Sequence, residues 1–184
     1  RQELDIRIKK RQLLYNTALP IMNSLYNFVR DSGFIIILTD EEGYILKLIG
    51  DKDIKEKASS QQNPLVEGSN RSENIVGTNS IGTVLATKEP LQLYASEHYC
   101  ALHFSWTCSG APIFSPEGDC IGVLCLSGTC NNVHLHTLGM AVSAATSITQ
   151  QIYLKMSHQK TMEIKNQLKT TLETLQNGTL LLNK

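Results

Sequence analysis

The stretch SWTCSGAPIFSPEGDCIGVLCLSG, residues 105–128, predicts a β-hairpin around which the rest of the chain is organised. Two apolar runs flank a polar turn at residues 116–119, and this pattern is typical of paired strands. Between Leu91 and Leu154 the chain carries only three charged residues, Glu97, Glu117 and Asp119. The hairpin and its neighbours are therefore expected to supply most of the core.

Upstream of the hairpin, the pattern alternates between helix and strand. Residues 1–30 place apolar side chains at helical spacing, and Pro20 predicts a kink or a break in that helix. Residues 33–51, GFIIILTDEEGYILKLIGD, predict two strands joined by a turn. Residues 51–74 are polar and predict a loop that includes one short helix.

Helical patterns also lie directly before and after the hairpin region. A helix is expected after an N-cap at Asn79 or Ser80, and a short strand at residues 91–94 follows it. From about His134 the pattern is helical for roughly forty residues, or about 60 Å. These elements predict an α+β domain, in which an antiparallel sheet carries the N- and C-terminal helices on one face.

The second half of the last helix carries a narrow apolar seam, made by Ile164, Leu168, Leu172 and Leu175. On so long a helix, the seam favours a coiled coil with a second copy of the chain. The alternative is a single solvated helix, because a short heptad run is a weak signal. The final NGTLLLNK, residues 177–184, predicts a turn and the first strand of another domain.

Composition excludes several classes of protein. The 17 basic and 17 acidic residues balance, so the chain has no charge signature for nucleic acid or an anionic membrane. Its five cysteines form an odd set without a signal peptide, which favours reduced thiols and a cytoplasmic location. Its apolar runs are too short to span a bilayer. The chain starts at Arg1 and is expected to be a fragment of a larger protein.

The segment HYCALHFSWTC, residues 98–108, concentrates residues that could carry chemistry. Its two histidines and two cysteines could bind zinc, but their spacing does not match a compact zinc knuckle. A cysteine nucleophile beside a histidine is a second interpretation, with Cys100, Cys108 and Cys120 as candidate thiols. The third interpretation, the wall of a small-molecule pocket, is the one we favour. No metal, cofactor or enzymatic activity is expected.

Three stretches resemble one family: residues 16–46, residues 76–99 (VGTNSIGTVLATKEPLQLYASEHY) and the hairpin at 105–128. They are similar to the amino-terminal GAF sensor domain of sigma-54-dependent transcriptional activators, in the acetoin-catabolism and dihydroxyacetone-kinase regulator group. A PAS fold would fit the first stretch alone, but the two later stretches favour GAF. The chain has no phosphate-binding loop of the Walker type, so by itself it should neither hydrolyse ATP nor bind DNA.

The resemblance implies a domain order. It places an N-terminal helix extension at 1–11, the GAF sensor at 12–150, a coiled-coil signalling helix at 151–176 and the start of a PAS-like domain at 177–184. It also implies a small-molecule effector, a homodimer, and downstream modules in the full-length protein that contact DNA and sigma-54 RNA polymerase. Two alternatives stay open: a GAF domain that only dimerises or docks a protein, and a redox enzyme of the methionine sulfoxide reductase kind.

In such a domain the effector pocket lies between the sheet and the segments that cross it, here from about Gly77 to Cys108. Aromatic side chains with polar tips and small polar groups are expected to orient the ligand. The candidate binding residues are Trp106, His98, Tyr94, Cys108, Asn79, Ile81, Thr83, Tyr99 and His103. Trp106 is expected at the edge of the pocket rather than in the core, so that its truncation to Ala would cost only roughly 1 to 2 kcal/mol.

Overall fold

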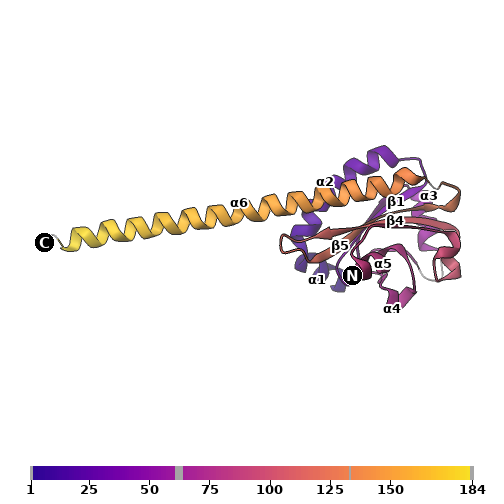
Figure 1. Ribbon diagram of the computed structural model, residues 1–184, viewed down its shortest axis with the longest axis horizontal. Helices are drawn as coiled ribbons and strands as arrows, with labels where there is room; N and C mark the ends of the chain where they lie inside the picture. The colour runs from indigo at the N-terminus through magenta and orange to yellow at the C-terminus, as the bar shows by residue number, and fades with distance from the viewer. Residues whose placement is uncertain (1, 61–63, 133, 183–184) are drawn as a thin grey trace.

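A single five-stranded antiparallel sheet forms the centre of the computed structural model, which describes residues 2–60, 64–132 and 134–182 (Figure 1). The strands lie in the order β2-β1-β5-β4-β3. They are β1 (Phe34–Thr39), β2 (Ile45–Gly50), β3 (Leu91–Tyr94), β4 (Trp106–Phe114) and β5 (Cys120–Thr129). The expected hairpin at 105–128 is β4–β5, in which Trp106 is opposite Thr129 and Pro112 is opposite Val123. The α+β class with an antiparallel sheet is confirmed.

The helices fall into two groups by the face of the sheet that they cover. The long ones are α2 (Gln12–Val29) and α6 (Leu135–Leu182), preceded by the separate α1 (Gln2–Lys10). The short ones are α3 (Lys52–Ser59), α4 (Glu73–Val76) and α5 (Ser80–Thr87), and single 3₁₀ turns follow at Ala95–Glu97, Ala101–His103 and Cys130–Asn132. The described part of residues 51–74 therefore contains one helix and the start of a second.

Both faces of the sheet are buried, and alternate residues of each strand belong to different cores. On one face, Ile36 and Leu126 pack with Ala145 and Ile148 of α6 and with Met22 of α2. On the other face, the strands pack under α3 and α5 in a second cluster, which contains Ile35, Ile37, Cys125, Ile54, Ile81 and Trp106. This double burial explains the uninterrupted apolar run of β1, in which every residue is buried.

Helix α6 is 48 residues long and projects well beyond the domain as a single rod (Figure 1). Its first half packs on β4 and β5, and Phe114 N donates to Thr149 Oγ1 at 3.1 Å. From Tyr153 to Thr174 every side chain is exposed. The turn and strand expected from residue 177 are wrong as far as Leu182, because the helix continues to that residue; residues 183 and 184 lie outside the described part.

The expected break at Pro20 is absent, because α2 runs from Gln12 to Val29 with Pro20 inside it. Both Pro20 and Asn16, whose carbonyl oxygen the proline cannot serve, are exposed. Water can therefore hydrogen-bond to the Asn16 carbonyl oxygen, and the helix continues through Pro20 with its apolar face against the sheet. The chain instead interrupts its helix at Arg11, between α1 and α2.

A close approach between strands makes Gly122 the glycine whose replacement should most disturb the core. A Cβ at Gly122 would lie 2.2 Å from the Thr39 carbonyl oxygen and 3.1 Å from Leu14 of α2. We expect Gly122→Ala to destabilise the domain by about 2 kcal/mol or more. The matched control is Gly139→Ala in α6, where a Cβ meets nothing within 4 Å; it should stabilise by about 0.5 to 1 kcal/mol. Urea unfolding would measure both, and equal effects would contradict this packing.

Candidate functional site

A small cavity lies on the face of the sheet opposite α2 and α6. The centre of a water molecule can occupy about 30 Å³ of this cavity. The whole atom-free space around that volume is about 420 Å³, and part of it opens to solvent. A single water needs roughly 10 to 15 Å³ of the volume that water centres can occupy. The cavity therefore suits a ligand of a few heavy atoms. Its lining comprises Ile37, Leu65, Arg71, Asn79, Ser80, Ile81, His98, His103, Trp106, Cys108 and Ser127.

Six of the nine predicted binding residues line this cavity: Asn79, Ile81, His98, His103, Trp106 and Cys108. The other three lie outside it. Tyr94 is 46% exposed, Thr83 donates from the surface to Glu73 at 2.5 Å, and Tyr99 is 78% exposed with its ring against Gly77. Tyr99 instead donates its backbone N–H to the Thr78 carbonyl oxygen at 3.0 Å. That bond ties the segment carrying His98 to the loop before α5.

Asn79 positions the cavity wall and has no polar capacity left for a ligand. As the N-cap of α5, its Oδ1 accepts from the backbone N–H groups of Ile81 and Gly82, each at 3.1 Å. Its Nδ2 donates to the carbonyl oxygens of Arg71 and Gly77, each at 2.9 Å. An amide side chain offers two donors and two acceptor sites, so all four are used. The expected N-cap is confirmed, but Asn79 does not turn a free polar atom toward the cavity.

His98 presents one ring nitrogen to the cavity. Its Nδ1 lies 3.0 Å from the Ala95 carbonyl oxygen, which can only accept, so Nδ1 carries the proton. Burial lowers the pKa of His98, and the ring is therefore neutral at pH 7 with a bare Nε2. Ala95 itself has a φ of +46°, a strained backbone that aims its carbonyl oxygen at His98. Within the described part of the chain, Nε2 has no hydrogen-bond partner.

Trp106 lines the cavity but is buried more deeply than expected. Its side chain is 3% exposed and belongs to the second core cluster with Ile37 and Val123, so the expectation of a pocket-edge tryptophan outside the core is wrong. Lys57 lies over the ring, 5.7 Å from its centroid. The indole Nε1–H is buried and makes no hydrogen bond to any described residue. Truncation to Ala would thus cost nearer the 3 to 5 kcal/mol typical of a buried tryptophan.

Five of the lining residues were not predicted from the sequence, and Arg71 is the charged one among them. It follows a polar loop, where arginine normally faces solvent, yet it is only 2% exposed. Its guanidinium donates to the Pro64 carbonyl oxygen and, at 3.4 Å, to Ser69 Oγ. Burial lowers the pKa of Arg71 to about 10, which still leaves it charged at pH 7. A buried arginine beside two neutral histidines gives the cavity a positive charge. Nothing in the local sequence signals this burial.

The remaining polar groups of the cavity argue against a thiol nucleophile. Cys108 accepts from Ser127 Oγ at 3.2 Å, and its pKa is raised by the neighbouring Cys125 thiol and by burial. A protonated thiol is a poor nucleophile. All five cysteines are free. Among the described residues no group of three or more His, Cys, Asp or Glu is placed to hold a metal. The expectation of no metal stays a prediction.

The segment that contains Arg71 is connected to the N-terminal helix α1 by hydrogen bonds that pass through the turn between β1 and β2. The backbone N–H of Arg71 donates to the Gly43 carbonyl oxygen at 2.8 Å, and Asn70 Nδ2 donates to the Glu42 carbonyl oxygen at 3.1 Å. Gly43 and Glu42 form the β1–β2 turn. That turn also contains Asp40, a carboxylate that is 2% exposed.

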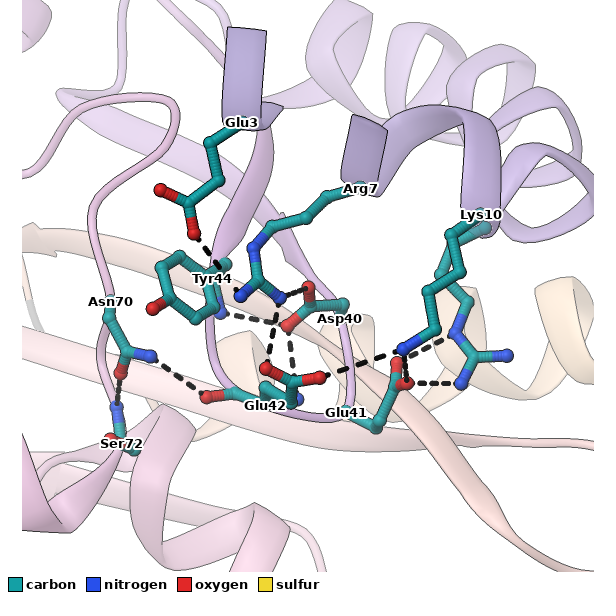
Figure 2. A network of polar contacts seen from close by, with 10 residues as sticks. Glu3, Arg7, Lys10, Asp40, Glu41, Glu42, Tyr44, Asn70 and Ser72 are labelled. Atoms are coloured by element: carbon teal, nitrogen blue, oxygen red, sulfur yellow. Dashed lines mark hydrogen bonds and ion pairs between the residues drawn. The ribbon is translucent and has the colours of Figure 1, made fainter. Parts of the chain in front are cut away.

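Arg7 of α1 holds the other side of this turn. Its Nη1 donates to Asp40 at 3.0 Å and to Glu42 at 3.1 Å, and its guanidinium lies 3.3 Å from the centroid of the Tyr44 ring. Arg11 pairs with Glu41 in the same turn. Helix α1 has no fully buried residue, and it is held by these charged contacts together with Leu4 and Ile8, which are partly buried against the core. Figure 2 shows the cluster between α1 and the turn.

The titration of His103 makes the cavity sensitive to acid. Burial, aided by the positive charge of Arg71, lowers the pKa of His103 from 6.5 to about 4. The unfolded chain therefore binds more protons than the folded one between these values, and stability falls as the pH drops from 6.5 toward 4. Between pH 7 and pH 5, the free energy of unfolding of His103→Gln should therefore fall by about 1 kcal/mol less than that of the wild type, allowing for solvent screening.

Urea unfolding at the two pH values would measure this difference. The control is His158→Gln, at an exposed histidine of α6, which should follow the wild type. A His103→Gln variant that loses as much stability as the wild type would contradict the assignment.

Comparison with known proteins agrees with this architecture. The chain is 38% identical over 154 residues to the signal-transduction and transcriptional-control protein of Clostridium beijerinckii, spanning 84% of this chain and 24% of that protein. It is 33% identical over 162 residues to the acetoin dehydrogenase operon transcriptional activator AcoR of Bacillus subtilis, covering 88% of this chain and 26% of that one. The chain thus spans about a quarter of the length of these curated relatives, whose names describe transcriptional control.

Among solved structures, the Escherichia coli DhaR(N)–DhaL complex contains a chain with the same fold. It matches with a TM-score of 0.87 at 16% identity, over 91% of this chain and 57% of that one. The model of the GAF domain family matches residues 15–152, which take in the whole sheet and the cavity. The chain therefore belongs to the GAF domain family.

Proposed function

We propose that this GAF domain is the sensor of a cytoplasmic bacterial transcriptional activator and that it binds a small-molecule effector in the cavity on its sheet. The observation that carries the proposal is the pair of buried polar atoms, His98 Nε2 and Trp106 Nε1, that lack partners among the described residues. Buried polar groups are hydrogen-bonded in the great majority of cases, and groups left open at a cavity suit a ligand. Relatives that regulate transcription support the regulatory role.

The effector would act by biasing the arrangement of the flanking helices. Because α2 and α6 lie on the opposite face of the sheet, a ligand touches neither helix directly. It touches Arg71, which the β1–β2 turn links to α1, and it touches β4 and β5, on which α6 packs. For a signal to result, the ligand must bind the two helix arrangements with different affinity. In the full-length protein, the receivers would be an AAA+ ATPase that contacts sigma-54 RNA polymerase and a DNA-binding domain.

We further propose that the domain dimerises through α6. Ile164, Leu168 and Leu172 are each more than half exposed on the part of the helix that leaves the domain. A regular apolar seam on an otherwise polar helix is what a partner helix buries in a coiled coil. The side chain of Leu175, the fourth predicted member, lies outside the described residues.

The alternative is a domain that docks a protein and has no small ligand. The solved complex of DhaR(N) with DhaL supports it, because the chain with this fold was crystallised with a protein partner. The unsatisfied polar atoms inside the cavity favour the small molecule instead.

Trp106 fluorescence tests the sensor function directly, because Trp106 is the only tryptophan of the chain and lines the cavity. A library of small polar metabolites should contain compounds that change its emission. At about 100 times its Kd, such a compound should also raise the melting temperature by about 5 to 10 °C. Trp106→Phe should fold, lose the optical signal and bind more weakly by calorimetry. A library without any such compound, set beside tight binding of a protein partner, would favour the docking alternative.

The dimer is tested by placing charge in the seam. We expect the wild type to sediment as a dimer at micromolar concentration. Leu168→Lys combined with Leu172→Lys should make it monomeric, because two buried lysines would repel their symmetry mates. The control is Asn166→Lys with Thr170→Lys, which adds the same charge on the opposite side of the helix. A monomeric wild type, or dissociation of both variants, would contradict a coiled coil through this seam.

A further inference from the structure

Two buried ring nitrogens of the cavity wall have complementary hydrogen-bonding roles. Trp106 Nε1 carries a proton and can only donate. His98 Nε2 is bare and can only accept, because the ring proton is committed to the Ala95 carbonyl oxygen. Both residues are 3% exposed, and neither nitrogen has a partner among the described residues. A molecule that satisfies both nitrogens must therefore accept one hydrogen bond and donate another.

The amide and hydroxyl side chains of the cavity wall are already engaged within the protein. Asn79 uses all of its donors and acceptors in the bonds described above. Ser80 Oγ lies 3.2 Å from Cys125 Sγ, and Ser127 Oγ donates to Cys108 Sγ at 3.2 Å. These three side chains therefore contribute little to the choice of ligand, and the two ring nitrogens contribute more.

Arg71 and His103 complete the polar part of the wall. Arg71 donates to Pro64 and Ser69, and His103 is partly exposed, so that water can reach its ring. The described residues that line the cavity include no aspartate and no glutamate. An ammonium group would therefore be buried there without a carboxylate to pair with, and the wall disfavours a cationic ligand.

A hydroxyl group is the smallest group that satisfies both ring nitrogens. Its O–H donates to His98 Nε2, and its oxygen accepts from Trp106 Nε1. A ketone, or a carboxylate at neutral pH, has no proton to donate and leaves the buried His98 nitrogen unpaired. A primary amide has two N–H donors, and one of them would be left among apolar side chains such as Ile37 and Ile81.

We infer that the effector is a small neutral alcohol whose hydroxyl group bonds to both His98 Nε2 and Trp106 Nε1. Its alkyl part lies against the apolar side chains of Ile37, Leu65 and Ile81. The volume that water centres can occupy, about 30 Å³, limits the alcohol to a few carbon atoms. This inference rests on the proposed sensor function and names the chemical class of its effector.

Four probes of nearly the same shape test this class: 2-propanol, acetone, acetamide and acetate. They have the same number of heavy atoms and differ in the hydrogen bonds that they offer. Ligands of this size bind weakly, so the titrations extend to about 100 mM. We expect 2-propanol to bind the wild-type chain at least about fivefold more tightly than each of the other probes, because the loss of one partner of a buried acceptor has that effect or more.

Nitrogen-15 NMR locates the bound probe. Trp106 is the only tryptophan of the chain and gives a single indole N–H signal. Addition of 2-propanol should shift this signal and also the signal of the unprotonated His98 Nε2. Acetone should shift the indole signal and leave the His98 signal nearly unchanged. Binding of 2-propanol without a shift of the indole signal would overturn the inference, because the alcohol would then be bound elsewhere.

A variant assigns the preference for the alcohol to its residue. His98→Phe should bring the ratio of 2-propanol to acetone affinity close to one, because the acceptor is lost and most of the ring volume is kept. The control is His158→Phe, at an exposed histidine of α6, which should leave this ratio unchanged. Ratios are compared because a small loss of folded protein affects both probes equally. If His98→Phe does not fold, the wild type still decides, since a His98 Nε2 signal that 2-propanol does not shift would refute the bond.

The outcomes distinguish this inference from the sensor function. Acetone, acetamide or acetate binding as tightly as 2-propanol would overturn the alcohol class. A library compound that binds when 2-propanol does not would overturn it as well. In both cases the sensor function stands, because the cavity still takes a small molecule. If neither the library nor any of the four probes binds, the sensor function itself fails, and the inference fails with it.

Discussion

Both faces of the central sheet must be kept from water, and the two faces meet this constraint differently. On one face α2 and α6 lay long apolar stripes against the strands and form a continuous core. On the other face the cover consists of short helices and 3₁₀ turns. Short elements bring many backbone N–H and C=O groups close to the core, and each group needs a partner. Asn79 supplies four such bonds at one point, and the cavity opens where this irregular cover does not fill the space above the strands.

Two arginines lie in different settings: the side chain of Arg7 is 15% exposed, whereas Arg71 is 2% exposed. Arg7 is matched with carboxylates and an aromatic ring, so its charge is compensated and the contact attaches α1 to the domain. Its partner Asp40 is 2% exposed, and this burial raises the pKa of Asp40. Arg71 lies in a cavity wall with neutral hydrogen-bond acceptors and neutral histidines. An arginine in the first setting stabilises structure, because carboxylates match its charge.

The arrangement also limits how a signal can leave the cavity. The helix that projects from the domain starts on the far face of the sheet, so the proposed ligand would act on it only through the strands. A second route runs around the edge, from Arg71 through the β1–β2 turn to Arg7 and α1. The edge route depends on ionic contacts, which weaken with salt. The route through the strands depends on close packing, as the proximity of Gly122 to Thr39 illustrates.

The sequence by itself determined the class of the fold. The hairpin at 105–128, the strand pair before it, the N-cap at Asn79 and the long last helix all follow from local patterns of period and turn residues, and their motifs carry the family resemblance. Local patterns also drew attention to the His98–Cys108 segment. The break predicted at Pro20 was wrong, because the exposure of a carbonyl group depends on which side of the helix faces solvent. The turn and strand predicted at residues 177–182 were wrong, because a single turn of polar residues is a weak signal for the end of a helix.

Tertiary structure alone decided the chemistry of the cavity. Tyr94 and Thr83 have the residue types of a binding site, but the backbone turns them outward. Arg71 has the residue type of a surface loop, and it is buried only because Asn79, eight positions later, and Gly43, from another strand pair, hold its backbone. Burial is a property of the folded surface, and it is set by contacts between segments distant in sequence. The presence of Arg71 in the cavity wall therefore could not be predicted from local sequence.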